Sequence, residues 1–159
     1  MKNGLGTSLE LYEFSDGLRK KAMAGLSEEA LLNRTSPLSN PLIWMFGHIA
    51  VMRFRIGNGL GTEEKVPMEE FFGFRSKPEH TSSYPSLAEV DKFHKKATKR
   101  LYARMEAATG KLLNKKSPRS KKTIREAVNL LAHHEAMHLG QILFLRKHFG
   151  LDSKDPLMD

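Results

Sequence analysis

The feature that most constrains this chain is an unbroken helical pattern across residues 123–149. Apolar residues recur there at steps of three and four, which is the spacing of one buried helix face. They are Ile124, Val128, Leu131, Ile142, Leu145 and Phe149. The positions that continue this stripe between Leu131 and Ile142 hold His134 and His138. The pattern therefore predicts a long helix with two imidazoles on its buried face.

This histidine pair favours a metal site. Residues four apart lie on one face of a helix, so both rings can reach the same point. A buried imidazole needs a partner, because burying an unpaired polar group is costly. A divalent metal is such a partner for neutral ring nitrogens, and backbone or side-chain oxygens are the alternative. His133 lies about 100° further round the helix and is not expected to join the pair.

Length and composition limit the remaining choices. A chain of 159 residues is long enough for one domain with a real core, which we place at 1–152, followed by a tail at 153–159. The absence of Cys excludes thiolate ligands and a Cys nucleophile, so any metal needs N and O ligands. We see no membrane span or signal peptide and expect a cytoplasmic protein. The net charge of +8 permits an anionic ligand or nucleic acid without selecting either.

Capping boxes predict where three of the helices begin. The caps are Thr7, Ser86 and Thr123, each with a Glu three residues later. The first helix is expected to end near Gly25, the third to be closed by Gly110, and the last to end before Gly150. A short helical turn is expected at 27–32. In the third helix we assign the core position to Phe93, which leaves His94 at the flank as a weak ligand candidate.

A second helix is predicted to open at Asn40 and Pro41, as N-cap and first helical residue. His48 occupies a core position in its apolar stripe, and glycines from Gly57 onward are expected to end it. A long connection over 58–85 follows. Its aromatic residues suggest either the wall of a pocket or a separate apolar cluster. They are Phe71, Phe72, Phe74 and Tyr84.

Four amphipathic helices without a convincing strand predict an all-α fold, a four-helix bundle with a long connection between helices 2 and 3. Such bundles build metal sites from inward-facing residues of different helices. The candidate ligands are therefore His48, His134 and His138.

A competing motif overlaps the same residues. The segment from His134 to His138 matches the H-E-x-x-H pattern of zinc proteases, in which Glu135 would be the general base. The longer form of that pattern needs a downstream Gly and a third His. Gly140 comes one position early and Phe144 stands where the His belongs. No strand pattern offers a sheet on which to align a peptide, so we do not favour a protease.

Two segments together resemble the DinB family, the DinB/YfiT-like metalloenzymes. Residues 44–48 are similar to its W-x-x-G-H segment, and residues 134–142 are similar to its H-x-x-x-H-x-G-Q-I segment. The resemblance covers nearly the whole chain. It implies a three-histidine site at His48, His134 and His138. It also implies, for members of known activity, thiol transfer or isomerisation with bacillithiol, mycothiol or glutathione.

The leading functional hypothesis is thus a metal-dependent thiol S-transferase or isomerase. The expected cofactor is a divalent metal such as Zn, Ni, Fe, Co or Cu, since three imidazoles suit all of them. The expected partners are a small-molecule thiol and an electrophile, with no membrane, and a homodimer is compatible with the sequence. Glu135 is expected to make a structural hydrogen bond. Gln141 is expected to orient a ligand or to cap a helix contact.

Two alternatives belong to other classes. One is a non-catalytic, metal-stabilised bundle that binds a ligand or partner. The other is a nucleic-acid binder that uses the basic loop at residues 115–122. That loop has no interleaved aromatic residues for stacking bases, so we interpret it as a solvated loop or as a feature that attracts an anionic thiol.

Overall fold

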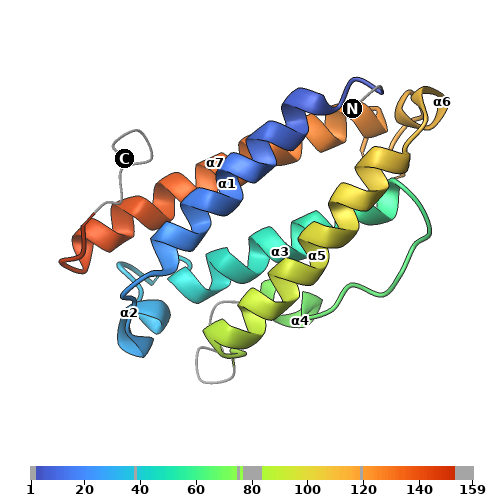
Figure 1. Ribbon diagram of the computed structural model, residues 1–159. Helices are drawn as coiled ribbons and strands as arrows, with labels where there is room; N and C mark the ends of the chain where they lie inside the picture. Colours follow the sequence, from blue (N-terminus) through green and yellow to red (C-terminus); the bar gives the residue numbers. More distant parts are fainter. Residues whose placement is uncertain (1–2, 38, 75, 77–83, 119, 153–159) are drawn as a thin grey trace.

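Four long helices dominate the computed structural model, which describes residues 3–37, 39–74, 76, 84–118 and 120–152. These are α1 (Gly6–Met23), α3 (Leu42–Gly59), α5 (Leu87–Ala107) and α7 (Ile124–His148) (Figure 1). The short helices are α2 (Glu28–Leu32), α4 (Glu69–Phe72) and α6 (Gly110–Leu113). No strand forms within the described ranges, so the all-α prediction is confirmed. The predicted tail at 153–159 lies outside them.

Helix α3 is the central element of the core. Of its 18 residues, 14 are buried, because it packs against α5 on one side and α7 on the other, with α2 and α4 also in contact. A helix that is apolar all round its circumference needs neighbours on every face. This explains why the remaining helices, which are amphipathic, are arranged around it.

The long connection follows from the direction of the helices. Phe54 packs on Phe93 and the Gly57 carbonyl accepts a hydrogen bond from Arg104, so α3 and α5 run parallel. The chain must therefore return along the length of the bundle between them, and Figure 1 shows this return passing through α4. Helices α1 and α7 are also parallel to one another, since Ser8 bonds to Asn129 and Arg146 bonds to the Ala22 carbonyl.

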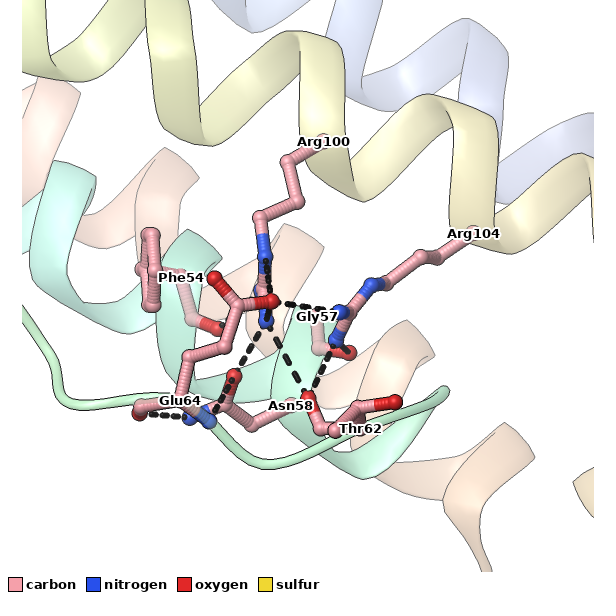
Figure 2. Close-up of polar contacts among 7 residues, drawn as sticks. All are labelled: Phe54, Gly57, Asn58, Thr62, Glu64, Arg100 and Arg104. Carbon is pink, nitrogen blue, oxygen red and sulfur yellow. Dashed lines mark hydrogen bonds and ion pairs between the residues drawn. The ribbon is translucent and has the colours of Figure 1, made fainter.

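Two arginines of α5 tie the connection to the end of α3 (Figure 2). Arg104 donates to the carbonyls of Gly57 and Thr62 at 2.8 Å each. Arg100 and Arg104 both donate to the Glu64 carboxylate, at 2.8 and 2.7 Å. The last carbonyls of a helix lack intrahelical donors, and here an adjacent helix supplies one. The start of the crossover is thereby held against α5.

Two predicted helix starts are wrong. Helix α1 begins at Gly6 rather than after a cap at Thr7, because Leu5 is fully buried and Asn3 accepts its amide hydrogen at 3.2 Å. Helix α3 begins at Leu42 with Pro41 as the N-cap, one residue later than predicted. Pro41 is extended there, with ψ of 160°, and its carbonyl accepts from Met45.

One predicted helix end is wrong and another is confirmed. The glycine-rich run that starts at Gly57 ends α3 as predicted, and the last helical residue is Gly59. Gly110 does not close α5, which ends at Ala107, and instead begins α6 behind a Thr109 cap. The capping boxes at Ser86 and Thr123 are confirmed. So are the short helix at 27–32 and the end of α1 before Gly25.

Candidate metal centre

Three imidazoles meet between α3 and α7. His48 comes from α3, and His134 and His138 come from successive turns of α7. One ring nitrogen from each lies within 4.8 Å of the others, and this is the group of potential ligands that the described residues form. His48 is buried and the other two are half-buried. The structure thus brings together the three histidines that the sequence singled out, whereas His133 is exposed on the outer face.

Hydrogen bonds to two of the rings leave one nitrogen of each ring available. His48 Nδ1 lies 2.8 Å from the Phe72 carbonyl oxygen, and His138 Nδ1 lies 2.9 Å from Gln141 Oε1. Both partners are acceptors, so Nδ1 carries the proton and Nε2 keeps its lone pair. A hydrogen bond of this kind orients a metal-binding histidine and makes it more basic.

Unlike the other two rings, His134 makes no hydrogen bond to an oxygen atom of a described residue. Its Nδ1 is buried without a hydrogen bond, and its Nε2 lies 3.2 Å from His138 Nε2. Because His138 donates from Nδ1, its Nε2 presents a lone pair toward His134. A divalent cation would take one nitrogen from each of the three rings and so supply a partner for His134. Neutral imidazole nitrogens on two helices are a donor set that fits such an ion.

Burial keeps the three rings neutral. Together with the nearby imidazoles it lowers the pKa of His48 and of His134 to about 4, although the hydrogen bond to the Phe72 carbonyl opposes this shift at His48. Burial also lowers the pKa of His138, against the opposing effect of the hydrogen bond that His138 donates to Gln141. At neutral pH all three rings are therefore in the form that binds a metal.

Aromatic residues wall the site on the side of the connection. Trp44 stacks on His48 with 4.4 Å between ring centroids, and its indole nitrogen donates to Ser76 at 2.7 Å. Phe72 packs onto the backbone of Gly47, where a side chain would overlap its ring. Phe72 therefore belongs to the wall of the site, whereas Phe74 is exposed.

A buried ion pair lies behind the histidines, and the sequence reasoning missed half of it. Arg53 binds both carboxylate oxygens of Glu135 at 2.7 Å, and both side chains are almost fully buried. Arg53 also donates to Asp16 and Thr98, at 2.7 and 2.6 Å. This agrees with the structural role predicted for Glu135. The available signal for Arg53 was a charged residue within the otherwise apolar segment five residues after His48.

The pairing of Glu135 also argues against the protease interpretation. A general base must reach the water or the substrate at the metal. Both oxygens of Glu135 are instead held by Arg53 on another face of α7.

His94 is not a member of the histidine group, and its predicted flank position is wrong. Phe93 and His94 are both buried, at 5% and 4% exposure, because α5 faces α3 with one side chain and α1 with the other. His94 lies 3.6 Å from Asp16 rather than beside the other three histidines.

A pocket of about 330 Å³ borders His134. It runs between α3 and α7 toward the loop that precedes α7, and most of its wall is apolar, including Met52, Ile56 and Leu131. Ser117, Pro118 and Ser120 of the predicted basic loop close its far end. The lysines of that loop are exposed, in a turn held by hydrogen bonds from Ser117 to Lys122 and from Ile124 to Lys115.

No helix among the described residues is long and apolar enough to span a membrane. Comparison with curated proteins and with solved structures found no significant match. The sequence matches the DinB superfamily over residues 18–142, well over half of the chain, and all three histidines lie within the matched segment. With this match and this arrangement of helices and histidines, we conclude that the chain belongs to the DinB superfamily.

Proposed function

We propose that this protein is a metal-dependent thiol transferase or isomerase. The observation that supports it is the convergence of three neutral imidazoles beside a mostly apolar pocket. His48, His134 and His138 would hold the ion, and the Phe72 carbonyl and Gln141 would fix the orientation of two of the rings. Such an ion lowers the pKa of a thiol that it coordinates, which makes a thiolate available at neutral pH.

The protein's own residues would then position the reactants. The chain contains no Cys, so the nucleophilic sulfur must come from a cosubstrate such as bacillithiol, mycothiol or glutathione. The apolar wall at Met52, Ile56 and Leu131 would hold the body of the electrophile and exclude water from it. The sulfur would form a bond to the electrophilic carbon, and the leaving group would depart with its bonding electron pair. The lysines around residue 120 would attract an anionic thiol.

A second candidate is a non-catalytic bundle that the metal stabilises and that binds a ligand in the same pocket. It is favoured by the histidine group itself, which among the described residues includes no carboxylate that could serve as a base. Cytoplasmic location and a homodimer remain predictions under either function.

Both candidate functions require a bound metal ion, and metal analysis tests this requirement. Protein isolated without chelator and without a His tag is expected to carry about one divalent ion per chain. His48→Ala and His138→Ala should each lower occupancy strongly, because each removes a ligand. His133→Ala is the matched control, since it removes an exposed imidazole from the same helix. Full occupancy in His48→Ala and His138→Ala would contradict the site.

Thiol binding separates the two candidates. In the Co²⁺-substituted protein, addition of bacillithiol, mycothiol or glutathione is expected to give sulfur-to-metal charge-transfer bands. The same thiol should then conjugate to a haloaromatic or epoxide, with activity lost in His48→Ala. A spectrum that no thiol changes, with the metal present, would leave the non-catalytic bundle as the function.

A further inference from the structure

A second cavity lies away from the histidines, between α1 and α5. Helix α1 packs on α7 and helix α5 packs on α3, which leaves a cleft of about 540 Å³ between α1 and α5. Both helices contribute charged and polar side chains to it, and none of the three clustered histidines lines it. The cleft therefore has its own chemistry, which the metal centre does not explain.

Arg19 is the main buried charge in this cleft. The residue is only 4% exposed, yet its guanidinium is incompletely paired. Nη1 donates to Asp91 at 2.8 Å, whereas Nε and Nη2 are buried and have no hydrogen-bond partner. A buried donor without an acceptor is costly, and a charged one more so. One edge of the guanidinium thus lacks the acceptor that its burial calls for.

Other arginines of this chain show what that edge binds. Arg53 uses Nε and Nη2 to hold the two oxygens of Glu135, and Arg100 uses the same two nitrogens to hold Glu64. Burial lowers the pKa of Arg19, and the pairing with Asp91 only partly offsets this. Arg53 is equally buried, but the charge and hydrogen bonds of Glu135 outweigh burial and raise its pKa. Compared with Arg53, Arg19 lacks a carboxylate partner among the described residues for its Nε and Nη2 edge.

The two aspartates of the cleft are already engaged. The Asp91 carboxylate binds Arg19 and Lys95, and the Asp16 carboxylate binds Arg53 and the Tyr102 hydroxyl. Neither is therefore free to complete Arg19.

Further positive charge lines the cleft. Lys20 and Lys99 are exposed there and form no ion pair with a described residue. His94 adds no charge, because burial holds its pKa well below the usual range, but the ring is 4% exposed and its Nε2 has no hydrogen-bond partner. The uncompensated charge of the cleft is positive, which favours an anion.

We propose that the cleft between α1 and α5 binds a small organic oxyanion, a carboxylate or a phosphate ester. Its oxygens accept from the Nε and Nη2 edge of Arg19, His94 Nε2 lies beside them, and Lys20 and Lys99 contribute charge at the rim. A cavity of about 540 Å³ is larger than a bare ion fills, so the ligand carries an organic body. This site does not depend on the function proposed for the metal centre.

Titration calorimetry on the full-length, Zn-loaded protein tests the site with three probes of similar shape. Benzoate and phenyl phosphate carry an oxyanion, and benzamide is the neutral counterpart. We expect one or both oxyanions to bind and benzamide not to bind. The oxyanion that binds with the higher affinity identifies the ligand as a carboxylate or a phosphate ester. Binding should also shift the His94 imidazole resonances, because that ring lines the cleft.

Charge variants locate the binding. Arg19→Gln is expected to weaken oxyanion binding by about tenfold or more, since it removes a charged double hydrogen bond. Lys99→Gln at the rim should weaken it by a smaller factor without threatening the fold. Lys92→Gln removes the same charge from an exposed position of α5 outside the cleft and should leave binding unchanged.

Three results would overturn the proposal. One is equal affinity for benzamide and the oxyanions. Another is an equal loss in Lys92→Gln and Lys99→Gln, which would mean only general attraction by a basic protein. The third is the absence of any oxyanion binding up to about 10 mM. If Arg19→Gln does not fold, the comparison of Lys99→Gln with Lys92→Gln still shows whether the oxyanion binds at the cleft.

Discussion

Gly47 controls how closely the crossover approaches the three-histidine group. It precedes His48 in α3, and a Cβ on it would overlap the ring of Phe72. The Phe72 carbonyl in turn accepts the hydrogen bond from His48 Nδ1. A glycine that weakens a helix by about 1 kcal/mol relative to Ala is thus what allows one ligand to be oriented. The residue that approaches this glycine depends on how the crossover folds back, so the sequence of α3 alone does not reveal it.

We expect Gly47→Ala to lower metal affinity by about tenfold or more, since it displaces Phe72 and releases His48 Nδ1. Gly17→Ala in α1 is the matched control. A Cβ at Gly17 meets nothing within 4 Å, so this change should leave metal affinity alone and add up to about 1 kcal/mol of stability. Competition with a chromophoric chelator measures the affinity. Unchanged affinity in Gly47→Ala would mean that the Phe72 carbonyl does not orient His48.

Gln141 allows a second test of ligand orientation. It is exposed, so replacing it costs little stability, yet its carbonyl oxygen accepts the bond from His138. Gln141→Leu is expected to weaken metal binding by roughly 10- to 100-fold. The thermal midpoint of the chelated protein should not change. A variant that binds metal like the parent would show that Gln141 only happens to lie near His138.

At the scale of the helices, local signals were predicted well and tertiary contacts were not. The boxes at Ser86 and Thr123 are correct because all their groups lie within four residues of one another. The box at Thr7 fails because a distant contact, the burial of Leu5, extends the helix past it. Similarly, arginines of α5 donate to the Phe54 and Gly57 carbonyls near the end of α3. Nothing within the α3 sequence announces those donors.

The pair of Arg53 and Glu135 fixes how α3 and α7 face each other. Glu135→Leu leaves a buried guanidinium without its main partner and is expected to cost about 3–5 kcal/mol. The double variant Arg53→Met, Glu135→Leu removes both charges and should recover much of that loss. Urea unfolding of the chelated protein measures the stability of Glu135→Leu, of Arg53→Met and of the double variant. If the double variant is as unstable as the sum of the two single variants, the pair does not act as a unit.

For the whole molecule, the convergence of the three histidines could be predicted and the second cleft could not. The three histidines replace apolar residues in two helical stripes, so a single helix pattern reveals each of them. The cleft exists because α1 and α5 pack on different neighbours, which is a property of all four long helices together. Arg19, which lines this cleft, belongs to an otherwise ordinary amphipathic helix. The missing acceptor of Arg19 can be recognised only after all its other partners are known.

The stability of the whole molecule should depend on pH in a direction that the histidines set. In the unfolded chain these rings titrate near pH 6.5. In the folded chain the pKa values of His48 and His134 are about 4, and that of His138 is also lowered, all mainly by burial. As pH falls below about 6.5 the unfolded state therefore takes up protons first. The stabilisation present above that pH is lost toward pH 4.

Metal binding should make this loss steeper, because protons compete with the ion for the same nitrogens. At pH 7.5 the metal-loaded protein is expected to melt at a higher temperature than the chelated one, since the ion binds only the folded chain. As the pH is lowered from 7.5 to 4.5, the two thermal midpoints should converge, with the metal-loaded one falling faster. Scanning calorimetry with and without chelator at each pH gives both curves. Curves that stay parallel over this range would mean that the ion is bound elsewhere, by groups that do not titrate there.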